Sequence, residues 1–261
     1  MYLQSFRLDG QVAVVTGGSK GIGRSIALGF AEAGAKQVIV ARSQSELDKV
    51  VEEIKSIGGE AISVAADLCD QNGIDKVYEK TVETYGKCDI LVNNAGINIR
   101  NTNSFEMGKG DLEKVIDLNL IAAFNMTLKF GKSMCQQKSG CIVNMSSIAG
   151  TMAVRTGSAY AMSKAGLIEM TKYLALEWGK YGVRINAIAP WYFVTPLTDT
   201  VLKNESYKNK VLGRTMLPRL GEMVDLASLT VFLASEASSF ITAQTIYCDG
   251  GMKEYGFDPT V

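Results

Sequence analysis

The sequence predicts an α/β fold with a doubly wound parallel sheet of about seven strands and helices on both faces. Short, continuously apolar segments alternate with longer segments of helical periodicity along most of the chain. A strand that is apolar on both sides is buried on both faces, as in parallel sheets covered by helices. With 261 residues, no linker and no repeat, residues 1–261 are expected to form one domain.

The first strand, turn and helix are the clearest part of this pattern. Val12-Ala13-Val14-Val15 is an apolar, β-branched run that ends in Thr16-Gly17-Gly18-Ser19-Lys20-Gly21-Ile22-Gly23. Ile26, Ala27 and Phe30 then recur at helical spacing. Glycines between a strand and a helix let backbone N–H groups approach a pyrophosphate. The turn therefore predicts a nucleotide-binding loop, with a purely structural turn as the alternative.

The later elements follow in the same alternation. Further strands are expected at 37–41, 61–65, 89–92, 141–144, 184–189 and 244–248. Ser43-Gln44-Ser45-Glu46 has the spacing of a capping box and opens the second helix. The remaining helices are expected near 74–82 and at 111–137, 158–180 and 226–234. Segment 190–221 holds three of the four prolines and is expected to be a helical excursion, a candidate substrate lid at about 191–220.

The composition excludes several classes of partner. There are 27 basic and 27 acidic residues without a basic block, so binding to nucleic acid or to an anionic membrane is not expected. No apolar run approaches the ~18 residues of a spanning helix, and the first ten residues, with Arg7 and Asp9, do not resemble a signal peptide. The expected location is the cytoplasm.

The cysteines and the missing histidine limit the possible chemistry. Five scattered cysteines without a Cys-x-x-Cys pair indicate reduced thiols. The absence of histidine removes the commonest zinc ligand and the usual general base, so no metal site is expected. Any proton transfer must use another side chain.

Tyr160 and Lys164 are the candidates for that proton transfer. They are four residues apart, so on a helix their side chains share one face. A nearby ammonium favours the phenolate of a tyrosine, whose ordinary pKa is about 10, and we expect Lys164 to lower the pKa of Tyr160. Ser147, thirteen residues before Tyr160, could orient a substrate oxygen. A Tyr-x-x-x-Lys pair also arises by chance in many helices.

A hydrolase is the alternative from another class. Gly17-Gly18-Ser19-Lys20-Gly21 also matches G-x-S-x-G, the nucleophile elbow of α/β hydrolases. The serine of that elbow needs a histidine base, which this chain lacks. The motif therefore favours nucleotide binding.

The end of the second strand predicts which nucleotide binds. An acid there would bond the ribose 2′-hydroxyl of NAD and repel a 2′-phosphate, but the residues are Ala41, Arg42 and Ser43. Arg42 and Lys20 could hold the 2′-phosphate of NADPH, or could be solvated surface cations. We expect NADP(H).

Taken together, the motifs resemble the classical short-chain dehydrogenases/reductases. The resemblance rests on five features in this order, namely Thr16-Gly17-x-x-x-Gly21-Ile22-Gly23, Asn93-Asn94-Ala95-Gly96, Ser147, Tyr160-x-x-x-Lys164 and Asp249-Gly250-Gly251. It covers nearly the whole chain. It implies a Rossmann fold and an NADP(H)-dependent oxidoreductase that reduces a ketone to a secondary alcohol reversibly.

The resemblance also implies roles for individual residues. Tyr160 would be the general acid, Ser147 would bond the substrate oxygen, and Lys164 would hold the nicotinamide ribose and lower the pKa of Tyr160. Asn119 matches the helix asparagine that binds a water next to the lysine, although it could instead be bonded locally. The implied cofactor-binding residues, besides Tyr160 and Lys164, are Gly17, Ser19, Lys20, Gly21, Ile22, Gly23, Arg42, Ser43, Asp67, Leu68, Asn93, Ala95, Gly96, Pro190 and Thr195.

The sequence departs from the family pattern after Pro190. The family usually has glycine next, whereas this chain has Trp191-Tyr192-Phe193. Pro-Trp-Tyr, and Gly256-Phe257 after the last glycines, resemble the tropinone-reductase-like branch. The three aromatic residues could line a substrate pocket for a small cyclic or hydrophobic ketone, or could pack against the lid.

Other readings of the same fold remain open. The chain could be a 3-oxoacyl-[acyl-carrier-protein] reductase, for which Lys203, Lys208, Lys210, Arg214 and Arg219 offer lid cations, or a sugar- or gluconate-type dehydrogenase. An NADP-sensing binding protein would be expected to have lost Ser147, Tyr160 and Lys164. The family resemblance further implies a homotetramer or homodimer formed through the helices at 111–137 and 158–180.

Overall fold

The computed structural model describes residues 2–100 and 103–256 and confirms the predicted fold class. Its seven strands are all parallel, in the order β3-β2-β1-β4-β5-β6-β7. Their bounds are β1 Val12–Thr16, β2 Lys36–Ala41, β3 Glu60–Ala65, β4 Ile90–Asn93, β5 Gly140–Met145, β6 Val183–Pro190 and β7 Thr245–Cys248. The strand order reverses between β1 and β4, and ligands bind at the carboxyl ends of strands at such a point.

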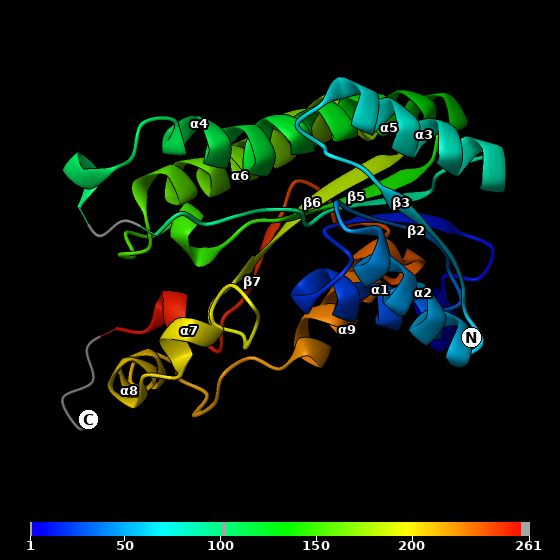
Figure 1. The fold of residues 1–261 in the computed structure, drawn as a ribbon. Helices are drawn as coiled ribbons and strands as arrows, with labels where there is room; N and C mark the ends of the chain where they lie inside the picture. Colours follow the sequence, from blue (N-terminus) through cyan, green and yellow to red (C-terminus); the bar gives the residue numbers. More distant parts are fainter. Residues whose placement is uncertain (1, 101–102, 257–261) are drawn as a thin grey trace.

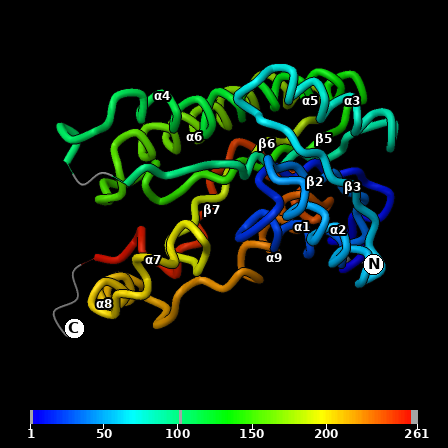
Figure 2. Tube along the Cα trace, viewed as in Figure 1, coloured from blue at the N-terminus to red at the C-terminus, as the bar shows by residue number. Residues whose placement is uncertain are grey.

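Helices cover both faces of the sheet (Figure 1). One face carries α1 (Gly21–Ala33), α2 (Gln44–Ser56) and α9 (Met223–Ala234), and the other carries α3 (Gln71–Tyr85), α4 (Asp111–Ile116), α5 (Ala122–Gln137) and α6 (Ser158–Trp178). In Figure 2, the segment with α7 (Asp199–Leu202) and α8 (Glu205–Leu212) lies apart from these two layers. Short 3₁₀ segments occur at Tyr2–Phe6, Ser104–Glu106, Ile148–Gly150, Gly179–Tyr181, Glu236–Ser238 and Met252–Glu254.

Two hydrophobic cores form because successive strand residues point to opposite faces. Ala13 and Val15 of β1 belong to the core beneath α1, α2 and α9, whereas Val14 belongs to the core beneath α3, α5 and α6. Phe30 of α1 and Phe130 of α5 are fully buried in these two cores. The sheet is thus fixed from both sides, which positions the loops at its carboxyl edge.

The helix predicted at 111–137 is present as one run of helical residues from Asp111 to Gln137, and it contains a π-helical turn that the prediction did not include. The π-helical turn Asp117–Ile121 separates α4 from α5 and contains the fully buried Asn119. Both ends of the Asn119 amide bond to Ile97, a residue of the loop after β4. A π turn holds one extra residue and often occurs at functional sites. Periodicity did not reveal it because the apolar spacing continues on both sides.

The predicted capping box at α2 is also absent, although the helix begins where expected. Ser43 is the residue before the first turn but makes no capping bond. Glu46 instead accepts a hydrogen bond from Ser19 in the glycine loop, at 3.3 Å. A contact from outside the helix has therefore replaced the local one. The predicted Gly256-Phe257 feature falls partly outside the described residues, since Phe257 is not among them.

Candidate active site

Hydrogen bonds of the Thr16 hydroxyl and of the Asn94 side-chain amide attach the glycine loop to the end of β4. The Thr16 hydroxyl accepts hydrogen bonds from the backbone N–H groups of Asn94 and Ala95, at 2.9 and 3.1 Å. The Asn94 side chain donates to the carbonyls of Thr16 and Gly17, at 2.9 and 3.2 Å. Gly17 has a φ of 64°, and a Cβ at Gly23 would overlap the Gly17 carbonyl oxygen. The backbone therefore forms a close-packed turn at the start of α1, which fits a pyrophosphate.

Polar and charged groups surround this loop at the ends of β2 and β3. Lys20 lies 3.8 Å from the Glu46 carboxylate, which also accepts the Ser19 hydroxyl. Arg42 is exposed, and among the described residues no carboxylate forms an ion pair with it. Ser43 is half-buried beside it. An exposed, unpaired guanidinium at this strand end fits a 2′-phosphate.

Other predicted cofactor residues lie along the same edge. Asp67 is exposed after β3 and its carboxylate accepts the backbone N–H of Cys69, while Leu68 is buried. Asn93 is buried, and its amide donates to Thr127 and Asn144, both at 2.8 Å. The donors of the Asn93 side chain thus serve a buried network between β4, β5 and α5. Ile22 is the second residue of α1, and Ala95 and Gly96 lie in the loop after β4. Pro190 is the buried last residue of β6.

Ser147, Tyr160 and Lys164 come together at the ends of β5 and α6. Ser147 precedes the turn Ile148–Gly150, its hydroxyl accepts the Ala149 backbone N–H at 3.2 Å, and it lies close enough to the Tyr160 phenol to oppose the rise of its pKa. The Lys164 ammonium lies 5.6 Å from the centre of the Tyr160 ring and donates to the Met145 carbonyl, at 2.6 Å. A Cβ built on Gly96 would lie 3.6 Å from that ammonium. The three predicted catalytic side chains therefore lie beside the loop that follows β4.

The direction of the Tyr160 pKa is opposite to the expectation. Burial raises the pKa of the phenol above its ordinary value and outweighs the lowering by the Ser147 hydrogen bond and by the charge of Arg100. Lys164 is itself buried, and burial lowers its pKa to about 8. The ammonium bonds to a main-chain carbonyl, not to the phenol. Tyr160 is consequently protonated at neutral pH.

Asn119 fixes the loop after β4 against α6. Its Oδ1 accepts the Ile97 N–H at 2.8 Å, and its Nδ2 donates to the Ile97 carbonyl at 2.9 Å and to the Ser163 hydroxyl at 3.0 Å. Ser163 in turn donates to the Tyr160 carbonyl. Asn119 is thus connected to the helix of Tyr160 and Lys164 through protein groups.

The beginning of the lid lies over the glycine loop. A Cβ built on Gly21 would lie 3.7 Å from the Thr195 Cβ and 3.4 Å from Pro196. The Thr195 backbone N–H donates to Thr198, which closes a turn before α7. Thr195 is therefore close to the start of α1, although it follows Gly21 by 174 residues.

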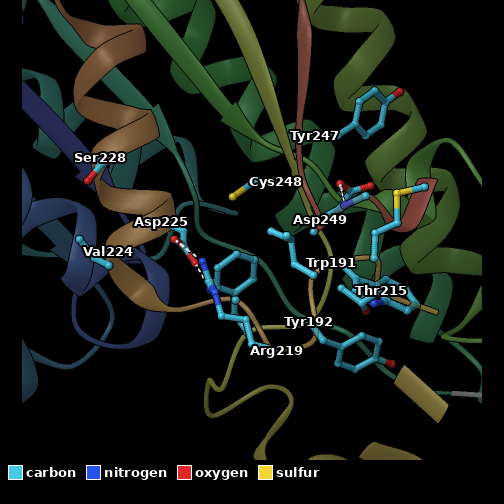
Figure 3. A pocket seen from close by; sticks show the side chains of 16 residues that line it. Trp191, Tyr192, Thr215, Arg219, Val224, Asp225, Ser228, Tyr247, Cys248 and Asp249 are labelled. Atoms are coloured by element: carbon cyan, nitrogen blue, oxygen red, sulfur yellow. Dashed lines mark hydrogen bonds and ion pairs between the residues drawn. The ribbon is translucent and has the colours of Figure 1, made fainter. Parts of the chain in front are cut away.

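Trp191, Tyr192 and Phe193, at the start of the segment predicted to form the lid, line a cavity of about 720 Å³. Its other walls come from residues 215–228 and 247–251, and they do not include Ser147, Tyr160 or Lys164. Figure 3 shows the ion pair of Arg219 and Asp225 on one wall of this cavity. Phe193 is almost fully buried and contacts Gly221. The three aromatic side chains thus line a cavity and also pack within the lid.

Three residues of the site were not singled out from the sequence. Asn94 holds the glycine loop, and its only signal was its place in Asn93-Asn94-Ala95-Gly96. Ser163 bonds Asn119, and it stands inside the Tyr-x-x-x-Lys spacing. The charge of Arg100 partly opposes the rise in pKa that burial causes at Tyr160 and Tyr192, and nothing in the sequence pattern indicated this residue.

The described residues contain neither a candidate metal site nor a candidate membrane-spanning helix. In residues 2–100 and 103–256, no three His, Cys, Asp or Glu side chains are grouped in a way that could hold a metal ion. Within the same residues, no helix has both the length and the apolar character needed to cross a membrane.

Comparison with known proteins places the chain among reductases and dehydrogenases of similar length. A family model described as enoyl-(acyl carrier protein) reductase matches residues 17–253. The 3-oxoacyl-[acyl-carrier-protein] reductase FabG of Thermotoga maritima is 38% identical, over 94% of this chain and 99% of that protein.

Two solved structures are similar to this chain over nearly its whole length. One is a gluconate 5-dehydrogenase from Burkholderia cenocepacia J2315 in complex with NADP and tartrate, with 31% identity, a TM-score of 0.93 and coverage of 97% of this chain and 99% of the other. The second is a short-chain type dehydrogenase/reductase from Mycobacterium marinum, with 30% identity, a TM-score of 0.91 and the same coverage of 97% and 99%.

Proposed function

Because this chain belongs to the short-chain dehydrogenase/reductase family, we propose that it is an NADP(H)-dependent oxidoreductase that interconverts a small ketone and its secondary alcohol. The main observation behind the proposal is that Ser147, Tyr160 and Lys164 meet beside the loop after β4, whose Asn94 side chain bonds the glycine loop. A proton donor and a nucleotide site at one strand edge suit hydride transfer to a carbonyl.

In the proposed reaction, the chain's own residues handle the carbonyl oxygen. The nicotinamide supplies hydride to the carbonyl carbon. Tyr160 donates its proton to the carbonyl oxygen, and Ser147 donates a hydrogen bond to that oxygen. The raised pKa of Tyr160 keeps the phenol protonated, as a proton donor requires. Lys164 binds the nicotinamide ribose, and Asn119 keeps the loop after β4 in place.

The residues present fit NADP better than NAD. A Cβ at Gly17 would overlap Asn94 and Ala95, and one at Gly23 would overlap Gly17 and Asn94, so the tight turn at the start of α1 requires glycine at both positions. The end of β2 offers Arg42 in place of an acid, and the relative from Burkholderia cenocepacia was solved with NADP. Glu46 partly offsets the charge of Lys20, which leaves Arg42 as the main ligand of a 2′-phosphate.

For the substrate, the relatives favour an acyl-carrier-protein or gluconate type over a neutral cyclic ketone. A carrier protein is acidic and would need free cations on the lid. Three of the five lid cations, Lys203, Lys208 and Arg219, are instead paired with Asp199, Glu205 and Asp225, whereas Lys210 forms no ion pair within residues 2–100 and 103–256. Arg214 lies over the Tyr255 ring. We therefore place a small, diffusible substrate of the gluconate type first and a 3-oxoacyl thioester second.

We also propose that the chain forms a homodimer or homotetramer. Large apolar side chains are exposed on both helices that the sequence assigns to an interface. They are Ile121, Phe124 and Leu128 beside or on α5, and Met162, Tyr173 and Leu176 on α6. Exposed apolar groups gathered on neighbouring helices are typical of a contact between copies.

The substitution Tyr160→Phe tests the proposed reaction. It removes the proton donor but keeps the ring, so we expect NADPH-dependent turnover to fall by about 10²- to 10⁴-fold. NADPH affinity should be nearly unchanged. Turnover is followed by NADPH oxidation with sugar ketones, 3-oxoacyl thioesters and cyclic amino ketones.

The matched control is Tyr181→Phe, an exposed tyrosine on the turn after α6, which should retain full turnover. Near-normal turnover of Tyr160→Phe would exclude the proposed role. NADPH binding without turnover of any ketone by the unmodified chain would instead support an NADP-sensing protein.

A further inference from the structure

Tyr160 is the third residue of α6, so its position depends on how that helix begins. The residue before the helix is Gly157, which has a φ of 130° and no side chain to accept a hydrogen bond from the first turn. A Ser, Thr, Asp or Asn side chain usually accepts that bond and fixes the start of a helix. The first turn of α6 therefore lacks a cap of its own, although it carries the proposed proton donor.

The loop that follows β4 supplies bonds to this helix start from outside. The Asn98 side-chain amide donates to the Thr156 hydroxyl at 2.8 Å, and the Ser104 hydroxyl donates to the Ser158 hydroxyl at 3.2 Å. Thr156 lies four residues before Tyr160, and Ser158 two residues before it. The Asn98 bond is the shorter of the two and joins half-buried residues, whereas Ser104 is exposed. Asn98 therefore makes the stronger connection.

The backbone next to Asn98 is fixed in place. The Asn119 amide bonds both the N–H and the carbonyl of Ile97, at 2.8 and 2.9 Å. A Cβ built on Gly96 would lie 3.6 Å from the Lys164 ammonium. The Asn98 side chain thus connects a backbone segment anchored beside Lys164 to the start of α6.

The Asn98 side chain is only partly satisfied. Its amide N–H donates to Thr156, but its Oδ1 is buried and has no hydrogen-bond partner among residues 2–100 and 103–256. A buried acceptor without a partner costs about as much free energy as one hydrogen bond contributes, or more. The stability of the fold therefore does not by itself explain this asparagine.

We propose that Asn98 is a positioning residue for Tyr160, because its bond to Thr156 holds the uncapped first turn of α6 and so keeps the phenol beside Ser147. This inference rests on the proposed function and adds to it a residue that acts through the proton donor. Asn98 itself exchanges neither the hydride nor the proton. A displacement of about 1 Å at a reacting group can lower a rate by about 100-fold, so one bond at this place has a measurable effect.

Three substitutions around this bond test the proposal. Asn98→Ala removes the donor, Thr156→Val removes the acceptor with little change of shape, and Thr156→Ser is the matched control that keeps the hydroxyl. With 5-oxogluconate and NADPH, Asn98→Ala and Thr156→Val should each lower kcat by about 10- to 100-fold and leave the KM for NADPH unchanged. Thr156→Ser should retain most of the activity. The variant with both Asn98→Ala and Thr156→Val should lose no more than either single variant.

Two further measurements separate a role in the reaction from a role in stability. Displacing the proton donor slows proton transfer, so the solvent deuterium isotope effect on kcat should be larger in Asn98→Ala than in the unmodified chain. A loss of folded protein would lower kcat and leave that isotope effect unchanged. The thermal unfolding midpoint of Asn98→Ala should not fall, because the variant also removes the unpaired Oδ1. An unchanged isotope effect, or equal losses of kcat in Thr156→Ser and Thr156→Val, would overturn the assignment.

A measurement without turnover distinguishes this inference from the proposed function. In the full chain isotope-labelled at the ζ carbons of its tyrosines, the Tyr160 NMR resonance is assigned by its absence in Tyr160→Phe. Because burial raises the pKa of Tyr160, loosening α6 in Asn98→Ala should lower that pKa and shift the resonance, whereas Thr156→Ser should not. A shifted resonance without turnover of any ketone would support the positioning role and reject the proposed reaction. An unshifted resonance with normal kcat in Asn98→Ala would reject the positioning role and keep the oxidoreductase.

Discussion

The two halves of the carboxyl edge of the sheet are built in different ways. In the half formed by the glycine loop, main-chain groups shape the site, since the Gly23 backbone packs on Gly17 and the carbonyls of Thr16 and Gly17 accept hydrogen bonds from the Asn94 amide. In the half formed by the lid and the loop after β4, side chains shape it, as in the bond between Tyr192 and Tyr207. A site made by backbone requires glycines at fixed spacing and leaves a local motif, whereas a site made by side chains does not.

The difference extends to the cations of each half. Arg42 lies directly after β2, next to the glycine loop, and Arg100 lies in the loop after β4, next to Tyr160 and Tyr192. The first is proposed to bind the 2′-phosphate of the cofactor. If the two halves are independent, a change in one should leave the ligand of the other unaffected.

The largest effect is expected from Gly23→Ala, which tests the backbone-shaped half. The added methyl would overlap the Gly17 carbonyl oxygen, and the nearest neighbours are main chain or the Asn94 amide that holds the loop. We expect a loss of about 1–3 kcal/mol in the free energy of unfolding from overpacking. Displacing the loop by about 1 Å should also lower turnover by about 100-fold. Urea unfolding and NADPH titration measure the two effects.

Gly179→Ala is the control for that experiment. Gly179 has a helical φ of −56° and no atom within 4 Å of an added Cβ. It should cost neither stability nor nucleotide affinity. A Gly23→Ala variant that binds NADPH normally would show that the loop adapts and that its backbone does not define the site.

The second largest effect is a pH-dependent change in the free energy of unfolding that arises from Lys164, which lies between the two halves. Burial lowers its pKa from 10.5 to about 8, so below about pH 8 the folded protein carries the full cost of a buried charge. Between pH 8 and 10.5 the unfolded chain binds more protons, and stability rises with pH. The two pKa values differ by about 2.5, so at about 1.36 kcal/mol per pKa unit the unmodified chain should gain about 3 kcal/mol over Lys164→Met between pH 7 and 10.5.

Urea unfolding at the two pH values measures this gain. Lys172→Met is the control, because Lys172 is exposed on the same helix and should show no such difference. If the stability difference between the unmodified chain and Lys164→Met were independent of pH, Lys164 would not be buried as a charged group in the folded protein.

The sequence predicted the features that depend on neighbouring residues and missed those that depend on contacts between distant side chains. The strands and the glycine loop were predictable because apolar runs and glycine spacing are local. The π turn at Asn119 was not, because it depends on bonds to Ile97, 22 residues earlier. The upward direction of the Tyr160 pKa was also missed, since the spacing of Tyr160 and Lys164 gives no measure of burial. Arg100 gave no signal because its neighbours come from α6 and the lid.

The smallest effect is expected from Arg42→Ala, which tests whether the two cations act independently. Losing one charge-assisted hydrogen bond of about 1.5–3 kcal/mol should raise the KM for NADPH by about 10- to 100-fold and leave the KM for NADH unchanged. Glu46→Gln should lower the KM for NADPH. The change should correspond to less than about 1 kcal/mol, because the Lys20–Glu46 pair is exposed. Arg100→Gln should leave the NADPH to NADH preference unchanged, and the double variant should show the sum of both effects. A change of nucleotide preference in Arg100→Gln would mean that the two halves are coupled, most directly through Asn94 and Gly96 in the loop that connects the glycine turn to Arg100.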